Sequence, residues 1–320
     1  MPSSTLDDLV DAYARVSSRN RLMLNAFASI AQQFRQQGIT SIVLKGADVI
    51  SRLYGVRGSR PIADVDLLVH ESDLPAIDRL LGNLGFTQQI DGNPSYASSE
   101  QGLSLDLITS FWYLDNRELG DLWTRARTRT FGHTTISCLD TADLLIYLTA
   151  YAVIHRGHLS AAFAQDMKLL IEKEPPDWSA VIARTKRARL EMPLLHGLSH
   201  VRKLFSSIVI PDSVLVALFP ENRKEQRLAW LLRKLVTTEP LPEIGHLLLF
   251  LTQPGRNKLA WLMQRLYPST VFLSYRYGSV GLSMPWKARL LRVYHLTEAG
   301  LLLSGRVLRR LTAASAEPLP

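Results

Sequence analysis

Residues 64–69 read Asp-Val-Asp-Leu-Leu-Val, and this stretch decides the fold that we expect. Its two acids alternate with apolar residues, so on a β-strand Asp64 and Asp66 point to one face while Val65 and Leu67 point to the other. The carboxylates then stand about 6 to 7 Å apart along the strand. Because like charges held so close repel each other, we expect a divalent cation with oxygen ligands, such as Mg²⁺, at this face.

The apolar end of the stretch predicts a central strand, because it makes both faces of the strand apolar. The ordinary alternative is a pair of surface acids on an edge strand. That alternative does not explain why apolar residues, Leu67, Leu68 and Val69, follow the acids on both faces of the strand. A third acid, Asp106, lies between two leucines in the strand candidate 103–108. A neighbouring strand can bring Asp106 beside Asp64 and Asp66. Three converging carboxylates suit two-metal phosphoryl chemistry, in which one ion activates the attacking oxygen and the other holds the triphosphate.

Upstream of the acids, Lys45 and Gly46 stand where a short β-branched strand pattern changes to a helical pattern. The free amides of a helix N-terminus can hold phosphate at such a turn. A solvated Lys45 and a simple tight turn at Gly46 remain open as alternatives. Arg57 and Arg60 lie in the following loop, and a guanidinium fork suits triphosphate oxygens, although Arg57 could equally face solvent.

These motifs resemble the polymerase-beta-like nucleotidyltransferase superfamily, and within it a bacterial branch that carries LKG followed by R-x-x-x-D-x-D-L-L-V. The resemblance implies that Asp64, Asp66 and Asp106 bind the metals, with Asp106 as a ligand or a base for the incoming hydroxyl. It also matches Arg60 to the arginine four residues before the first acid. The chain departs from the superfamily at Ala47, where a serine commonly follows the glycine, so one hydroxyl contact to phosphate is missing.

A second group of residues, His155, His158 and Asp166, resembles the H-x-x-H and later Asp of the same branch. The resemblance implies a role in binding nucleotide or orienting the acceptor. The group is a poor zinc site, because Gly157 weakens the helix and no fourth ligand is spaced nearby. A polar network at a helix end, joining two lobes, is the alternative.

The chain has 320 residues, with 37 Lys and Arg against 29 Asp and Glu, a net charge of +8. This balance favours an anionic ligand such as a nucleotide, a nucleic acid or a membrane surface, or else is a basic surface without a specific partner. A single cysteine, Cys138, excludes an internal disulfide and indicates a reducing compartment. With no signal-peptide pattern and no apolar run long enough to span a bilayer, we expect a cytoplasmic protein.

The order of strand and helix patterns predicts an α+β fold: a small mixed nucleotidyltransferase-type sheet with helices, followed by an all-helical lobe. We expect four parts, which are N-terminal helices packing on the core at 1–38, a catalytic domain at 39–140, a helical domain at 141–312 and a disordered tail at 313–320.

Basic residues edge an apolar helix or helix pair near the C-terminus, namely Arg289, Arg292, Arg306, Arg309 and Arg310. Such helices can lie on membranes or bind acidic partners. More often the apolar face covers a core and the basic face is solvated. Peripheral membrane contact through these helices therefore stays open.

We predict a nucleotidyltransferase, dependent on Mg²⁺ or Mn²⁺, that moves a nucleoside monophosphate from a nucleoside triphosphate such as ATP and releases pyrophosphate. The acceptor would be a hydroxyl or phosphate of a small molecule, saccharide or peptide, since the resemblance implies accessory enzymes of natural-product or polysaccharide pathways. One alternative is a catalytically weak, nucleotide-binding scaffold in a biosynthetic complex. Another is RNA-end modification, which the charge permits but for which the sequence offers no basic and aromatic array.

Overall fold

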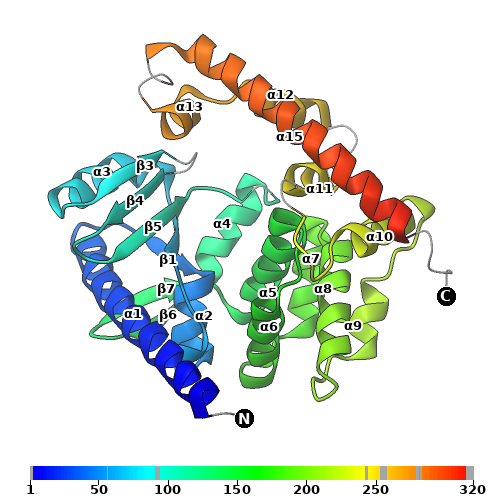
Figure 1. Ribbon diagram of the computed structural model, residues 1–320, viewed down its shortest axis with the longest axis horizontal. Helices are drawn as coiled ribbons and strands as arrows, with labels where there is room; N and C mark the ends of the chain where they lie inside the picture. Colours follow the sequence, from blue (N-terminus) through cyan, green and yellow to red (C-terminus); the bar gives the residue numbers. More distant parts are fainter. Residues whose placement is uncertain are drawn as a thin grey trace. The chain divides into compact units, whose positions relative to one another are not determined.

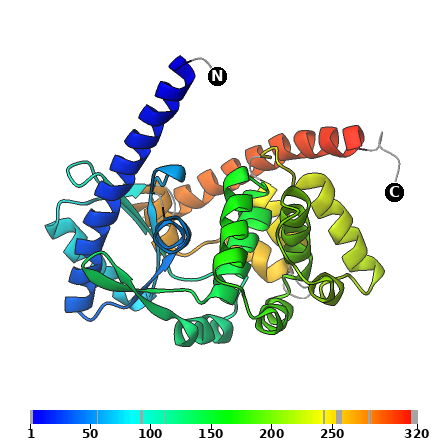
Figure 2. The ribbon, with the colours of Figure 1, turned by 90° about the horizontal axis from the view of Figure 1, so that it is seen from below.

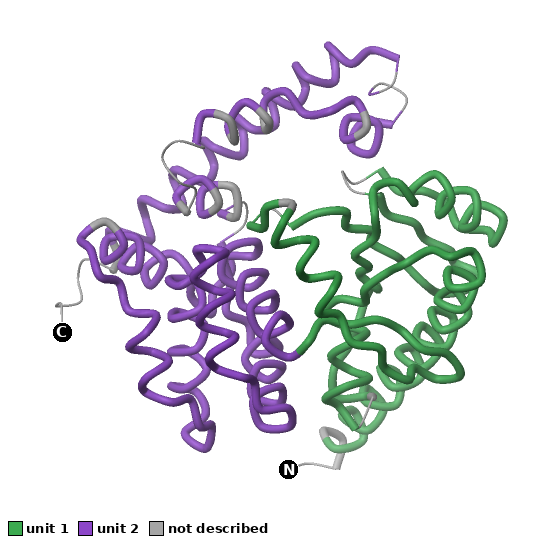
Figure 3. The backbone as a smooth tube through the Cα atoms, turned by 180° about the vertical axis from the view of Figure 1, so that it is seen from behind, with its two compact units in different colours: residues 1–140 green, residues 141–320 purple. Residues whose placement is uncertain are grey.

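The chain forms two compact units in this computed structural model, residues 1–140 and residues 141–320 (Figure 3). Unit 1 combines a mixed β-sheet with helices and unit 2 is helical, so the fold is α+β, as predicted. The structure describes residues 3–55, 57–90, 94–111, 113–241, 244–252, 258–278, 281 and 283–314. The predicted disordered tail lies outside the described residues from residue 315 onward.

Unit 1 begins with one long helix and continues with strands and short helices. Its elements are α1 (Ser3–Gln36), β1 (Ser41–Leu44), α2 (Lys45–Leu53), η1 (Arg57–Ser59), β2 (Val65–Val69), η2 (Glu71–Asp73), α3 (Leu74–Asn83), β3 (Thr87–Ile90), β4 (Pro94–Ser98), β5 (Leu103–Ile108), α4 (Asn116–Arg125), β6 (Arg127–Phe131) and β7 (Thr134–Cys138).

The seven strands form one sheet in the order β3-β4-β5-β2-β1-β7-β6 (Figure 1). Strand β2 is the fourth of these seven, and all five of its residues are buried. It pairs antiparallel with β1 and parallel with β5, which makes the sheet mixed. The prediction that the acidic stretch forms a central strand is therefore confirmed.

One face of the sheet contributes to a continuous hydrophobic core with α1 and α3. Val65, Leu67 and Val69 of β2 belong to this core, as do Phe27 and other apolar residues of α1. Phe27 also packs edge to face against Phe131 of β6, with ring centroids 5.4 Å apart. Since side chains alternate along a strand, burying these β2 residues turns the acids of the same stretch to the opposite face.

Helix α1 is a single helix, and its N-terminal part extends past the sheet (Figure 2). Leu9 and Val10 are exposed there. Tyr13 lies against η1, where a Cβ atom on Gly58 would come within 2.5 Å of the tyrosine ring. Glycine is therefore the residue that lets this turn approach α1.

Three elements of unit 1 lack a clear signal in the sequence. Strand β3 is polar and fully exposed, so it shows no apolar alternation. Strand β4 and helix α4 fall in stretches that the hydrophobic pattern leaves unassigned. Strands β6 and β7 form a hairpin, joined by a turn in which Gly132 has a φ of +58°.

Unit 2 consists of helices. They are α5 (Thr141–Ala150), the π-helical segment η3 (Tyr151–Arg156), α6 (Ala161–Lys173), α7 (Trp178–Ala188), α8 (Glu191–Leu204), α9 (Asp212–Ala217), α10 (Arg223–Leu235), α11 (Ile244–Thr252), α12 (Lys258–Leu266), α13 (Thr270–Tyr277) and α15 (Pro285–Ala314). Among the described residues, no helix combines the length and hydropathy that crossing a bilayer requires.

The packing of α1 predicts that Phe27→Ala lowers the free energy of unfolding by about 3–5 kcal/mol, because it removes a buried aromatic ring and leaves a cavity. Urea denaturation measures this change. Leu22→Ala is the matched control on the same helix, since Leu22 is 67% exposed, and its effect should stay within about 0.5 kcal/mol. Equal losses in the two variants would contradict the placement of α1 against the sheet.

Candidate active site

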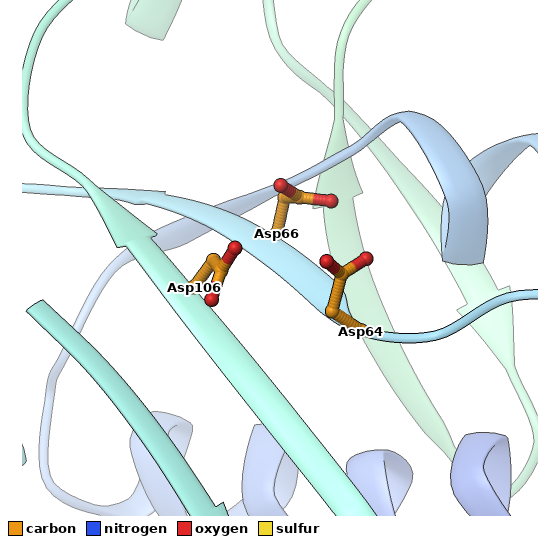
Figure 4. Close-up of side chains that lie close together, drawn as sticks. All are labelled: Asp64, Asp66 and Asp106. Atoms are coloured by element: carbon orange, nitrogen blue, oxygen red, sulfur yellow. The ribbon is translucent and has the colours of Figure 1, made fainter. Parts of the chain in front are cut away.

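The parallel pairing of β2 with β5 brings three acids together. Asp66 lies directly opposite Asp106 in this register. The sequence pattern places the start of this strand at Asp64. In the structure β2 begins at Val65, so Asp64 immediately precedes the strand. One carboxylate oxygen from each of the three lies within 4.8 Å of the other two (Figure 4). The convergence of Asp64, Asp66 and Asp106 expected from the sequence is thus present in the structure.

Asp66 is the buried member of this carboxylate triad, and the other two are partly exposed. The pKa of Asp66 is raised from 3.8 to about 6, chiefly by burial and also by the negative charges of Asp64 and Asp106, while Lys45 acts to lower it. The Nζ atom of Lys45 lies 2.6 Å from Oδ1 of Asp66. The negative charge of the site is therefore poorly solvated, and the ammonium group of Lys45 offsets part of that charge.

Lys45 reaches Asp66 from a strained backbone position. It is the first residue of α2, directly after β1, and its φ is +31°, in the left-handed region that side chains other than glycine rarely adopt. Such a conformation costs about 1 kcal/mol or more, and it persists only where the surroundings impose it. The turn from β1 into α2, together with the register that sets Leu44 opposite Asp66, imposes it here.

Gly46 and Arg60 lie side by side next to this turn. A Cβ atom on Gly46 would meet Ile62 Cγ2 at 3.0 Å and Arg60 Nη1 at 3.7 Å. Glycine at this position therefore lets the loop before β2 approach the N-terminus of α2. The structure brings Lys45, Gly46 and Arg60 together at one end of α2, whereas the side chain of Arg57 lies outside the described part.

A residue that the sequence pattern missed, Asn20 of α1, fixes the same loop. Its Nδ2 donates a hydrogen bond of 2.7 Å to the carbonyl oxygen of Arg60, and its Oδ1 accepts one of 3.3 Å from the amide of Ile62. Asn20 is only 1% exposed. The available signal was a polar residue on the core-facing stripe of a helix, because a buried amide needs hydrogen-bond partners.

A second buried carboxylate, Asp48, holds α2 against the end of β7. Arg52 Nη1 lies 3.4 Å from Asp48 Oδ2 and donates a 3.0 Å hydrogen bond to the carbonyl of Leu139. Asp48 also hydrogen-bonds with Cys138, and burial raises its pKa to about 6. These contacts anchor the helix whose first turn carries Lys45 and Gly46.

The carboxylate triad fits a divalent cation by its donor chemistry. Its three side chains offer hard oxygen ligands of the kind that Mg²⁺ and Mn²⁺ prefer. Burial first, and then the charges of Asp64 and Asp106, keep the pKa of Asp66 raised, and a bound cation would favour its charged form. Because Asp64 and Asp106 are only partly buried, the site keeps a side that is open to a ligand.

His155, His158 and Asp166 belong to unit 2. His155 lies in η3 with its ring stacked on Tyr151, the centroids 5.0 Å apart. The Nε2 atom of His158 makes a 2.8 Å hydrogen bond with the carbonyl of Thr238, so this ring holds the chain after α10. Asp166 is buried in α6. Their nucleotide role stays a prediction, and so does the alternative of a polar network joining two lobes, because the His158 contact lies within unit 2.

Comparison with known proteins identifies the family. The sequence profile of a family described as "Uncharacterised nucleotidyltransferase" matches residues 1–206, which is more than half of the chain. The chain therefore belongs to this family of nucleotidyltransferases. The match spans unit 1 and continues through α8. It does not distinguish the LKG branch, which stays a prediction.

Among solved structures, the chain is similar to one described as "Crystal structure of an antigenic nucleotidyltransferase-like protein from Paracoccidioides brasiliensis". The sequence identity is 18% and the TM-score is 0.45, and the alignment covers 61% of this chain and 93% of that one. No curated protein matches the chain.

The burial of Asp66 predicts a specific pH dependence of stability in metal-free buffer. Because its folded-state pKa, about 6, lies above the ordinary 3.8, the folded protein takes up a proton between pH 6 and pH 4 that the unfolded chain does not. The protonation of Asp66 therefore raises the free energy of unfolding as the pH falls from 6 to 4. Asp66→Asn removes the buried charge and should raise the free energy of unfolding at pH 8 by roughly 2–3 kcal/mol.

The gain of Asp66→Asn over the wild type should disappear as the pH approaches 4, as urea denaturation across this range can show. Glu100→Gln is the control, since Glu100 is an exposed acid of the same unit. Adding Mg²⁺ at pH 8 should stabilise the wild type and leave Asp66→Asn unchanged. A stability difference independent of pH would contradict the buried charge at this position.

The contacts of Asn20 predict that Asn20→Ala destabilises unit 1 by about 1–3 kcal/mol, because it removes the hydrogen bonds to the part-buried carbonyl of Arg60 and to the buried amide of Ile62. It should also weaken the binding of a nucleoside triphosphate, since Arg60 loses its support. Urea denaturation and isothermal titration measure the two effects. Asn25→Ala, an exposed asparagine of the same helix, should change neither, and nucleotide binding left intact in Asn20→Ala would refute the positioning role.

Proposed function

We propose that this chain is a metal-dependent nucleotidyltransferase that transfers a nucleoside monophosphate from a nucleoside triphosphate to an acceptor hydroxyl or phosphate. The observation that supports the proposal most is the carboxylate triad, with its oxygens within 4.8 Å of one another on the central strands. Membership of the nucleotidyltransferase family supports it independently. Asp64, Asp66 and Asp106 would hold Mg²⁺ or Mn²⁺, which supplies charge neutralisation of the phosphates and activation of the attacking oxygen.

The residues of the chain divide the remaining work. Arg60 and the amides at the start of α2 would bind the phosphate oxygens, as guanidinium groups and helix N-termini commonly do. Lys45, whose ammonium group already contacts Asp66, would hold the negatively charged phosphates close to the triad. Gly46 leaves room for this approach, and Ala47 supplies no hydroxyl, so backbone amides carry that part of the phosphate contact.

Asp106 is the proposed base. Asp106 is partly exposed, in contrast to Asp66. It would accept the proton of the acceptor hydroxyl while the oxygen of that hydroxyl forms the new bond to the α-phosphorus. The bond between the α-phosphorus and the bridging oxygen then breaks, and pyrophosphate leaves. The structure of unit 1 thus suits in-line phosphoryl transfer, in which positioning and charge stabilisation supply most of the catalysis.

The acceptor is proposed as a small molecule, a saccharide or a peptide of a biosynthetic pathway. Unit 1 itself has 13 basic and 16 acidic residues. A nucleic-acid substrate gains most of its affinity from phosphate contacts with Lys and Arg, so this balance argues against RNA-end modification. A nucleotide-binding scaffold without turnover is the remaining alternative, and the assay below separates it from an enzyme.

We expect the purified chain to release pyrophosphate from one nucleoside triphosphate in the presence of Mg²⁺ and an acceptor panel of sugars, sugar phosphates and peptides. Asp64→Asn and Asp66→Asn should each lower this turnover by more than about 100-fold, because they remove metal ligands rather than their supports. Glu100→Gln should leave it unchanged. Chromatography of the nucleotides measures the reaction.

Two outcomes would contradict an enzyme of this type. Turnover that persists in both aspartate variants would exclude the triad as its centre. Metal-dependent nucleotide binding that the same variants abolish, without pyrophosphate release for any triphosphate and acceptor tested, would support the scaffold instead.

A further inference from the structure

The positive charge of the chain is concentrated in its last helices. Residues 258–314 contain nine basic residues and a single acid, Glu298, which gives this segment a net charge of +8. The rest of the chain contains 28 basic and 28 acidic residues and is neutral. The segment also lies beyond residues 1–206, where the family profile matches. The whole net charge of the protein thus belongs to a region that the nucleotidyltransferase match does not cover.

Helix α15, the longest element of this segment, carries a stripe of exposed apolar side chains. At 100° per residue its members fall within an arc of about 100°, so they share one face of the helix. Each is at least 42% exposed. We call this set the α15 stripe, and it spans about 33 Å along the helix axis. The stripe consists of Trp286, Leu290, Val293, Tyr294, Leu301 and Leu308.

The other side of α15 attaches the helix to unit 2. Ala288 and Leu303 are buried on that side. The guanidinium group of Arg292 lies 4.9 Å from the centroid of the Phe272 ring, and Arg310 donates a 2.8 Å hydrogen bond to the carbonyl of Leu235. The helix is therefore held mainly by this side, which lies opposite the α15 stripe.

Basic side chains flank the stripe. At 100° per residue, Lys287 and Arg309 project to one side of it and Arg289 to the other. Lys287 and Arg309 are exposed. The Nζ atom of Lys287 lies 5.5 Å from the centroid of the Trp286 ring, so charge and aromatic surface are adjacent. Long basic side chains beside an apolar stripe can extend to anionic groups while their stems contact apolar surface.

We propose that α15 is a peripheral membrane-binding helix, which lies on an anionic lipid surface with its stripe buried at the boundary between headgroups and acyl chains. The flanking basic residues would contact lipid phosphates. A large apolar face, basic flanks and only one acid in 30 residues are the composition of helices that lie in this interface. Trp286 and Tyr294 are residue types that favour the same boundary. This inference does not rest on nucleotide transfer.

The same observations disfavour two other occupants of the stripe. A second copy of α15 would bring two strongly basic helices together, and like charges at such a seam oppose pairing. A nucleic acid would engage the basic residues but would leave the apolar stripe exposed to water, because phosphate contacts rather than leucines supply that affinity. Of these three occupants, an anionic lipid surface is the one that satisfies the charge and the stripe together.

Vesicle flotation with the full-length chain tests the proposal. The chain should float with vesicles of phosphatidylcholine containing about one-third phosphatidylglycerol and not with phosphatidylcholine alone, because anionic headgroups attract juxtamembrane basic residues. Binding should weaken in about 1 M salt, where the Debye length shrinks to about 3 Å. Leu301→Glu should lower the partition coefficient by at least about 10-fold, since a charge replaces an inserting side chain.

Val216→Glu is the matched control, because Val216 of α9 is 73% exposed and Leu301 is 72% exposed. It adds the same charge outside the stripe and should cost much less binding. A second pair of substitutions, Lys287→Gln with Arg309→Gln, tests the charge separately and should weaken binding to the anionic vesicles. Circular dichroism and thermal unfolding of each variant establish that it is folded.

Several results would overturn the proposal. One is a wild-type chain that does not float with the anionic vesicles. Another is a loss of binding in Val216→Glu equal to that in Leu301→Glu, which would make the effect one of overall charge. A dimer that Leu301→Glu dissociates, in a chain that does not bind vesicles, would assign the stripe to a second copy. RNA that binds the wild type and Leu301→Glu equally, without vesicle binding, would assign the basic residues to nucleic acid.

Discussion

The repulsion among three carboxylates on one side of the β2 and β5 pair is the constraint on which the rest of unit 1 depends. The parallel register sets Asp66 opposite Asp106, and the central place of β2 removes Asp66 from water. Each choice costs free energy, because buried like charges are poorly solvated. The apolar face of the same strands offsets this cost by joining the core under α1 and α3. A central strand can therefore carry these acids because its other face is so thoroughly buried.

The elements around the triad act to hold it in place. The backbone strain at Lys45 puts an ammonium group 2.6 Å from Asp66. The strain costs roughly 1 kcal/mol, and the ammonium group offsets the burial of the carboxylate only in part, since the pKa of Asp66 stays raised. Asn20 fixes the loop that carries Arg60, while Arg52, paired with Asp48, anchors α2 to the carbonyl of Leu139. Strain, a raised pKa and buried polar contacts thus gather at one end of α2. Such concentration is typical of sites that bind charged ligands.

The sequence predicted the parts of this arrangement that depend on local alternation. Residues 64–69 and the strand around Asp106 show their apolar and acidic faces directly, so the central strand and the convergence of the acids follow from them. The contact of Lys45 with Asp66 could not be predicted, since it depends on a φ of +31° that no residue pattern encodes. Asn20 was missed because its partners are backbone groups 40 and 42 residues away. Strand β3 was missed because its stability comes from pairing with β4 rather than from burial.

The distribution of charge changes the interpretation of the overall +8. Unit 1, which carries the triad, has 16 acidic and 13 basic residues, so long-range attraction does not favour an anionic nucleotide there. For a nucleotide bound as proposed, short-range contacts at the start of α2, together with a cation on the triad, would have to supply that affinity. The excess positive charge lies instead in residues 258–314, the segment that contains the α15 stripe. A basic composition taken over a whole chain can thus point to the right class of ligand and to the wrong part of the molecule, because charge acts mainly within a Debye length.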